Sequence, residues 1–88
     1  MYKVLLKPQA KKEFERLPEE YAARMKTAFE ILQYEPRPFR EFDVQKISGS
    51  EQDYRIRIGK YRFIYSIFQE EQAIVILKID LRSETTYK

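Results

Sequence analysis

The sequence predicts an α+β fold of two layers, in which an N-terminal strand and a helical hairpin pack on a mostly antiparallel β-sheet. Two helix-like segments lie close together in the first half of the chain and meet at a proline, Pro18. The second half instead alternates apolar and polar residues with the period of a strand. No repeat divides the 88 residues, which suffice for one core. We therefore predict a single domain over residues 1–88 with the order β-α-α-β-β-β-β.

The first half of the chain is predicted to hold one strand and two helices. Residues 2–7 are mostly apolar with little alternation, which is typical of a strand covered on both faces. A helix over residues 8–17 begins at a proline, which suits a first helical turn. The next helix should end near Tyr34 or Glu35, because Pro36 disfavours helical geometry in the residue before it. Its apolar stripe predicts a core-facing side made of Tyr21, Met25, Ala28, Phe29 and Leu32.

The second half of the chain is predicted to hold four strands. After an irregular connector, residues 42–47 alternate and predict a short strand, followed by a turn at residues 48–50. A β-hairpin over residues 54–67 comes next, with Gly59 and Lys60 as its two-residue loop. This loop fixes the pairing of the two strands and gives one core face, on which we expect Tyr54, Ile56, Ile58, Tyr61, Phe63 and Tyr65.

The other face of this hairpin carries three arginines. The same pairing places Arg57 directly opposite Arg62, with Arg55 two residues further along. Like charges that face each other destabilise a sheet, so folding alone does not favour this arrangement. A bound polyanion would make the arrangement useful. The alternative is a solvated basic face that is relieved by nearby acidic side chains.

Residues 73–81 predict the last strand, after a polar loop at residues 69–72. The favoured register keeps Lys78 and Asp80 out of the core, because burying both of them would be costly. Asp80 is then expected beside Arg62, where it can hold the guanidinium group in position. This register predicts a core face of Val75, Leu77, Ile79 and Leu81, and it leaves Ile74 and Ile76 on the polar side.

Composition and charge limit the functions that the chain can have. It contains no cysteine and no histidine, which excludes disulfides, thiolate or imidazole catalysis and most zinc sites. No apolar run approaches the roughly 20 residues that span a bilayer, and no signal-peptide pattern begins the chain, so a cytoplasmic protein is expected. The formal charge is +3, and residues 54–62 alone hold four basic and no acidic side chains. This concentrated patch favours a phosphate-rich partner.

The order of elements and several motifs resemble the RelE/ParE superfamily of toxin–antitoxin toxins, closest to its RelE-like branch. The resemblance covers essentially the whole chain. It rests on motifs from the early helices to the C-terminus, namely Phe14 and Leu17-Pro18, Lys-Ile-Ser-Gly at 46–49, Tyr-Arg-Ile-Arg-Ile-Gly-Lys-Tyr-Arg-Phe-Ile-Tyr at 54–65, and Arg82 with Tyr87.

This resemblance implies the toxin of a type II toxin–antitoxin system, which cleaves messenger RNA on the ribosome and forms a hetero-oligomer with a cognate antitoxin protein. It implies chemistry without a metal or another cofactor, in which a ribose 2′-hydroxyl attacks the adjacent phosphate. Two alternatives within the superfamily stay open. One is a gyrase-inhibiting toxin, and the other is an inactive member that only binds its antitoxin.

Carried over position by position, the resemblance implies a cleft on the arginine face. Three residues match catalytic positions, the first of them placed to grip the scissile phosphate: Arg62, Arg82 and Tyr87. Four basic side chains are expected to contact RNA: Arg55, Arg57, Lys60 and Lys78.

Two departures from the family pattern bear on the chemistry. Four residues separate Arg82 from Tyr87, unlike the spacing in other members, and no histidine lies near Arg82. Arginines stabilise the charge on a phosphorane well, but they exchange protons poorly because they stay protonated. The general acid and base therefore stay open among Lys78, Glu84, Tyr87 and Lys88, with substrate or ribosome groups sharing the proton transfer.

Overall fold

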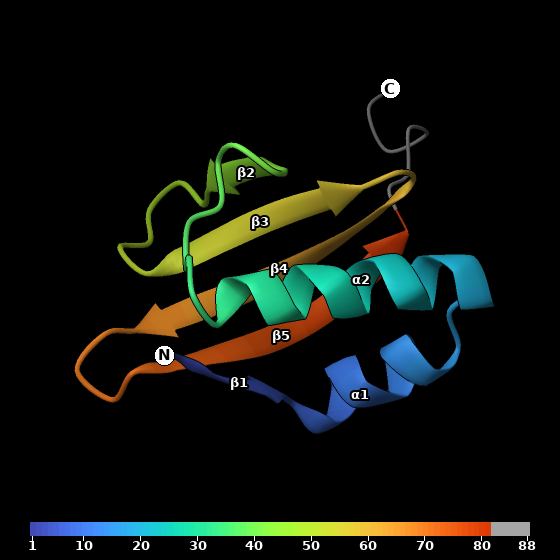
Figure 1. Ribbon diagram of the computed structural model, residues 1–88, viewed down its shortest axis with the longest axis horizontal. Helices are drawn as coiled ribbons and strands as arrows, with labels where there is room; N and C mark the ends of the chain where they lie inside the picture. The colour runs from blue at the N-terminus through green and yellow to red at the C-terminus, as the bar shows by residue number, and fades with distance from the viewer. Residues whose placement is uncertain (82–88) are drawn as a thin grey trace.

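The computed structural model describes residues 1–81, which fold into two helices and a five-stranded sheet (Figure 1). Along the chain the elements are β1 (Lys3–Leu6), α1 (Pro8–Glu15), α2 (Glu19–Leu32), β2 (Asp43–Lys46), β3 (Asp53–Ile58), β4 (Tyr61–Phe68) and β5 (Ala73–Leu81). The strands take the order β1-β5-β4-β3-β2, with β1 parallel to β5 and all other neighbours antiparallel. The predicted α+β class and element order are confirmed. Neither described helix has the length and apolar character that a membrane span requires.

Prolines set the starts of both helices. Pro8 occupies the first turn of α1, where a backbone N–H would have no partner inside the helix. Pro18 precedes α2, and Glu19 and Glu20 fill its first turn, where their charges complement the positive end of the helix dipole. The side of α2 that faces the sheet buries Met25, Ala28 and Leu32.

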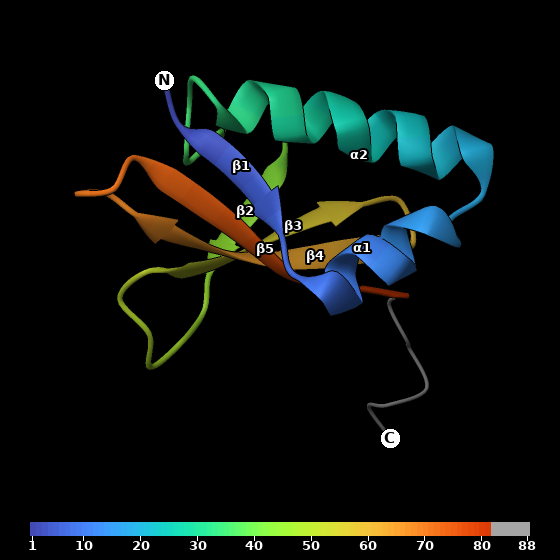
Figure 2. The ribbon, with the colours of Figure 1, turned by 90° about the horizontal axis from the view of Figure 1, so that it is seen from below.

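The core lies between the helices and one face of the sheet, which we call the covered face (Figure 2). Phe63 on β4 has no exposed surface, and its ring packs edge-on against Phe29 of α2 with 5.2 Å between centroids. Burying a side chain of this kind contributes about 1.5–3 kcal/mol. The hairpin pairs as predicted, because Ile56 lies opposite Phe63 and Tyr54 opposite Tyr65. The covered face of the hairpin therefore holds the expected set, Tyr54, Ile56, Ile58, Tyr61, Phe63 and Tyr65.

The connector between α2 and β2 is tied to the core through two tyrosine hydroxyls. The Tyr65 hydroxyl donates to the carbonyl oxygen of Pro36 at 2.7 Å, and Nε of Arg37 donates to the hydroxyl of Tyr54 at 3.0 Å. Burial raises the pKa of Tyr65, and the hydrogen bond to Tyr54 raises the pKa of Arg37. Each of these hydroxyls thus has the partner that burial requires.

The turn between β3 and β4 requires glycine at position 59 for two reasons. Gly59 has a φ of +59°, a backbone conformation that other residues rarely adopt. It also lies so close to Tyr21 of α2 that an added Cβ would be 2.7 Å from Cε1 of that ring. The Tyr21 ring in turn packs against Tyr61 on β4, with 4.7 Å between centroids. α2 therefore fixes the tip of the hairpin that carries the arginines.

The prediction that the first strand is covered on both faces is wrong. Among the described residues, β1 is an edge strand that pairs only with β5. Val4 and Leu6 pack against the core, whereas Lys3 and Leu5 are exposed, Leu5 by 48%. The run of apolar residues was misleading because Leu5 places an apolar side chain on the uncovered side of the strand.

A β-bulge interrupts the alternation of β5. Ile64 on β4 pairs with Lys78, but the next residue, Tyr65, pairs with Ile76. Leu77 is therefore an extra residue in β5, with no partner of its own in β4. One inserted residue moves the side chains on one side of it to the opposite face of the sheet.

The bulge makes the predicted core face of the last strand wrong. Ile74 and Ile76, predicted for the polar side, have no exposed surface. Of the residues predicted for the core Ile79 is buried, and the others are partly or largely exposed: Val75, Leu77 and Leu81. Strict alternation cannot place both Ile76 and Ile79 in the core, because they are three positions apart. The extra residue allows it.

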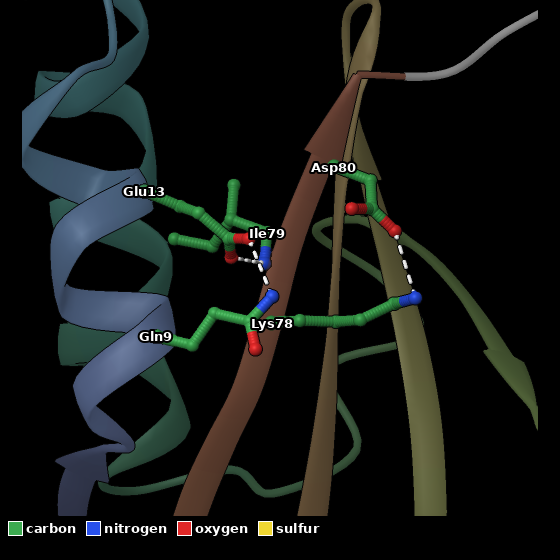
Figure 3. A network of polar contacts seen from close by, with 5 residues as sticks. All are labelled: Gln9, Glu13, Lys78, Ile79 and Asp80. Atoms are coloured by element: carbon green, nitrogen blue, oxygen red, sulfur yellow. Dashed lines mark hydrogen bonds and ion pairs between the residues drawn. The ribbon is translucent and has the colours of Figure 1, made fainter.

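α1 holds the part of β5 that lies beyond the end of β1 (Figure 3). Oε1 of Glu13 accepts a hydrogen bond from the backbone N–H of Ile79 at 2.7 Å. Its other oxygen accepts one from the side chain of Gln9 at 3.0 Å. Because β1 pairs with β5 only as far as Ile76, this carboxylate takes the place of a neighbouring strand. The contact fixes β5 just after the bulge, where the strand turns its charged residues away from the helices.

Candidate nucleic-acid interface

The face of the sheet opposite the helices, which we call the open face, carries the predicted arginines in adjacent strands. Across β2, β3, β4 and β5, one row of register partners consists of Asp43, Arg57, Arg62 and Asp80. The next row consists of Gln45, Arg55, Ile64 and Lys78. Side chains that face each other on neighbouring antiparallel strands have Cβ atoms about 4.5–5.5 Å apart. The structure therefore brings the three arginines together.

The carboxylate of Asp43 forms ion pairs with two of these arginines. Asp43 lies with Oδ1 at 3.7 Å from Nη2 of Arg55 and with Oδ2 at 3.4 Å from Nη1 of Arg57. The Arg55 side chain is 14% exposed, whereas those of Arg57 and Asp43 are 40% and 54% exposed. Ion pairs as exposed as the one with Arg57 contribute about 0–1 kcal/mol. Asp43 therefore relieves the repulsion between the arginines without cancelling it.

Arg62 differs from Arg55 and Arg57, which both form ion pairs with Asp43. Within residues 1–81 its guanidinium group belongs to no ion pair, although Asp80 is its register partner. The expected contact with Asp80 is not formed, because that carboxylate pairs with Lys78 instead. Nε of Arg62 is buried and has no hydrogen-bond partner in the described part of the chain. Such groups are uncommon and costly in folded proteins, so Arg62 has hydrogen-bonding capacity that the described fold leaves unused.

Lys78 and Asp80 extend the open face beyond the arginines. Nζ of Lys78 lies 3.2 Å from Oδ2 of Asp80, on the side of β5 away from α1 (Figure 3). The two side chains are 50% and 31% exposed, so both stay out of the core as the sequence predicts. The bulge in β5 is what reconciles this placement with a buried Ile76.

The remaining predicted site residues lie at the margin of the described chain or outside it. Lys60 is exposed in the turn at the tip of the hairpin. Arg82 and Tyr87, which the resemblance marks as catalytic, lie outside the described residues. The same holds for Glu84 and Lys88, two of the candidates for acid–base chemistry.

Asp43 is the member of this face that the sequence interpretation did not identify. The alternation of residues 42–47 was sufficient to place Asp43 and Gln45 on the same face of a strand. Alternation alone, however, specifies neither the neighbour of that strand nor its register. Asp43 faces Arg57 because β2 pairs with β3, which the separating turn at residues 48–50 would have favoured.

The chemistry of the open face suits an anionic partner. Guanidinium groups match the oxygens of a phosphate bidentately, and each such contact is charge-assisted. The described part of this face also holds two carboxylates and an ammonium group, namely Asp43, Asp80 and Lys78. Within residues 1–81, no group of three or more acidic side chains is arranged to hold a metal ion.

Comparisons with known sequences identify the family. A family model described as the ParE toxin of the type II toxin–antitoxin system parDE matches residues 4–86. A protein of Methanocaldococcus jannaschii whose name carries the designation toxin RelE1 is 36% identical over 77 residues. That match covers 88% of this chain and 84% of the relative.

Solved structures agree with these matches. A chain of the archaeal RelE–RelB complex from Pyrococcus horikoshii is similar with a TM-score of 0.85 and 38% identity, over 94% of this chain and 97% of that chain. A chain of the RelB–RelE antitoxin–toxin complex from Methanococcus jannaschii gives a TM-score of 0.77 at 24% identity, over 94% of each, and so shows the shared fold. This chain therefore belongs to the ParE toxin family of type II toxin–antitoxin systems, within the RelE/ParE superfamily.

Proposed function

We propose that this chain is a cytoplasmic toxin that arrests growth by cutting messenger RNA on the ribosome. In this proposal the RNA strand lies across the open face, and Arg62 holds the scissile phosphate. A ribose 2′-hydroxyl attacks that phosphate without the help of a metal. The observation that carries the proposal is the pair of opposed arginines, Arg57 and Arg62, of which Arg62 has a buried Nε without a partner among residues 1–81.

The arrangement suits a reaction in which negative charge grows on the substrate. Two facing guanidinium groups repel each other when no anion is present, and an anion between them removes that cost. The charge on the nonbridging oxygens is greatest in the phosphorane, so fixed donors stabilise that state more than the ground state. Removing one such donor lowers catalytic rates by about 10²–10³-fold.

A cognate antitoxin is the second part of the proposal. The Pyrococcus horikoshii relative was solved in a RelE–RelB complex, which supports a partner of the same kind for this chain. Ile74 and Ile76, which the sequence places on the polar side of the sheet, are buried and cannot contact an antitoxin, whereas Phe39 of the connector is 60% exposed and can. Co-expression with the product of a small adjacent reading frame should yield a stable complex and relieve growth arrest. Failure of every neighbouring product to bind would contradict this part.

The test of RNA cleavage compares Arg62→Ala with a control arginine elsewhere. Expression of the unaltered chain should arrest growth, and primer extension should show codon-phased cuts in cellular messages. Arg62→Ala should abolish both effects, because the phosphate loses its main donor. Arg40→Ala, an exposed arginine of the connector, should keep both. Equal toxicity of the two variants would sink the proposal, provided that both fold.

A gyrase-inhibiting toxin is the rival candidate, because the family model that matches the chain is described as ParE. For that activity the open face need not be catalytic. Intact messages together with double-strand DNA breaks would favour gyrase inhibition. If expression of the chain caused neither message cleavage nor DNA breaks, the chain would instead be an inactive member that only binds its antitoxin.

A further inference from the structure

We propose that Lys78 and Asp80 form the acid–base pair of RNA cleavage, with Asp80 as the general base and Lys78 as the general acid. This inference rests on the proposed function and supplies the proton transfers that the arginines cannot make. Cleavage next to a 2′-hydroxyl requires one group to take the 2′ proton and another to protonate the leaving oxygen. Arginine side chains stay protonated near neutral pH, so they are poor at both proton transfers.

Both residues lie beside the proposed phosphate site. Asp80 is the register partner of Arg62, and Lys78 is the partner of Ile64, two residues further along β4. Facing side chains on paired strands have Cβ atoms about 4.5–5.5 Å apart. A phosphate bound to Arg62 would therefore lie within reach of the carboxylate and the ammonium group together.

The ion pair brings the proposed acid and the proposed base into direct contact. Nζ of Lys78 lies 3.2 Å from Oδ2 of Asp80. The two side chains are 50% and 31% exposed, so a strand bound on the open face can reach both of them. Asp43, the other carboxylate of the row, is shared by Arg55 and Arg57 and has no ammonium partner among residues 1–81.

The proposed step balances in atoms and protons. Asp80 takes the proton of the 2′-hydroxyl while O2′ forms a bond to phosphorus. The bond from phosphorus to O5′ breaks, and O5′ takes a proton from Lys78. The products are a 2′,3′-cyclic phosphate and a 5′-hydroxyl. Because the pair is in direct contact, Asp80 can then return its proton to Lys78, which resets both groups without a further proton carrier.

The fold holds this pair from the other side of the strand. Ile79, the residue between Lys78 and Asp80, donates its backbone N–H to Glu13 of α1 at 2.7 Å (Figure 3). The bulge at Leu77 lets the strand bury Ile79 while the two flanking side chains stay on the open face. Glu13 is thus a positioning residue for the proposed pair.

The test uses ribosome-bound messages in which sulfur replaces the bridging 5′ oxygen of the scissile linkage. A thiolate leaves without being protonated, so this substrate needs the general base but no general acid. Lys78→Gln should cut the normal message about 100-fold or more slowly, yet cut the sulfur message within about fivefold of the unaltered chain. Asp80→Asn should cut both messages about 100-fold or more slowly. Asp80→Glu, which keeps a carboxylate, should be at least about tenfold faster than Asp80→Asn.

Matched controls separate this role from charge and from stability. Lys26→Gln and Glu70→Gln make the same charge changes at exposed positions on α2 and in the loop after β4. Both should stay within about threefold of the unaltered chain, as surface substitutions outside a site do. Thermal unfolding shows whether each variant is folded before its rate is compared.

The outcomes distinguish failure of the inference from failure of the proposed function. If the unaltered chain cuts the message and Asp80→Asn cuts it nearly as well, the acid–base assignment is overturned alone. The assignment is likewise overturned if the sulfur message does not restore cutting by Lys78→Gln, or if Asp80→Glu is no faster than Asp80→Asn. If the unaltered chain cuts neither message, the proposed function fails and the inference fails with it.

Discussion

The two faces of the β3–β4 hairpin are built from alternate residues of the same strands, yet one face packs apolar side chains and the other places like charges opposite each other. On the covered face Ile56 lies opposite Phe63, both without exposed surface, and the hydroxyl of Tyr65 has a hydrogen-bond partner. On the open face Arg57 lies opposite Arg62, whose Nε is buried without a partner in residues 1–81. The covered face minimises the free energy of the folded chain. The open face instead keeps two like charges opposite each other, and the ion pair of Arg57 with Asp43 is largely exposed.

The sharpest test of this contrast compares neighbouring residues of β4. Phe63→Ala should lower the free energy of unfolding by about 3–5 kcal/mol, because it leaves a cavity in the core. Arg62→Ala should change it by no more than about 1 kcal/mol, because this side chain makes no ion pair within the described residues. Urea denaturation of both variants measures the two values. If Arg62→Ala lowered the free energy of unfolding as much as Phe63→Ala, the side chains of the open face would also stabilise the fold.

The hairpin tip tests how far the covered face controls the open one. Gly59→Ala should cost about 2–3 kcal/mol, since it combines an unfavourable positive φ with a clash against Tyr21. Gly49→Ala, at a φ of +85° with no atom near the added Cβ, should cost about 1 kcal/mol. Thermal unfolding of both variants gives the comparison. Equal losses would mean that contact with α2 does not fix the turn.

The buried hydroxyl of Tyr65 gives a smaller and pH-dependent effect. Tyr65→Phe leaves the carbonyl oxygen of Pro36 without its donor and should cost about 1–2 kcal/mol at neutral pH. Burial raises the pKa of Tyr65 above its unfolded value of about 10, so the folded state holds this proton more tightly. That part of the stability is complete below pH about 10 and is lost as the pH rises further. Tyr65→Phe should therefore lose less stability than the unaltered chain between about pH 10 and 12, measured by urea denaturation.

The hairpin and the helices could be predicted from the sequence because local rules determine them. A proline is the first residue of α1 and another directly precedes α2, and a two-residue loop starting at Gly59 fixes the register of β3 and β4. That register alone places Arg57 opposite Arg62. These features need no knowledge of which strands become neighbours later.

The sequence predictions fail where the placement of a residue depends on which strands become neighbours in the sheet. The sequence pattern predicts a buried Leu5, but Leu5 is exposed because β1 is an edge strand. The bulge at Leu77 has no local signal, since it arises from packing Ile76 and Ile79 into one core. The ion pairs of Asp43 depend on the pairing of β2 with β3 in the same way. The proposed acid–base pair depends on such non-local contacts, which sequence spacing does not reveal.

The smallest predicted effect concerns the repulsion between the arginines themselves. Arg57→Gln removes one of two like charges that face each other, so it should stabilise the fold by about 0.2–1 kcal/mol at low salt. The gain should fall toward zero near 1 M KCl, where the Debye length is about 3 Å and the two charges no longer sense each other. Asp43→Asn should act in the opposite direction, because its carboxylate relieves the same repulsion. Urea denaturation at both salt concentrations measures all three proteins. If Arg57→Gln were less stable than the unaltered chain at low salt, Asp43 would already offset the repulsion between Arg57 and Arg62. The opposed arginines would then give no reason to expect a bound anion on the open face.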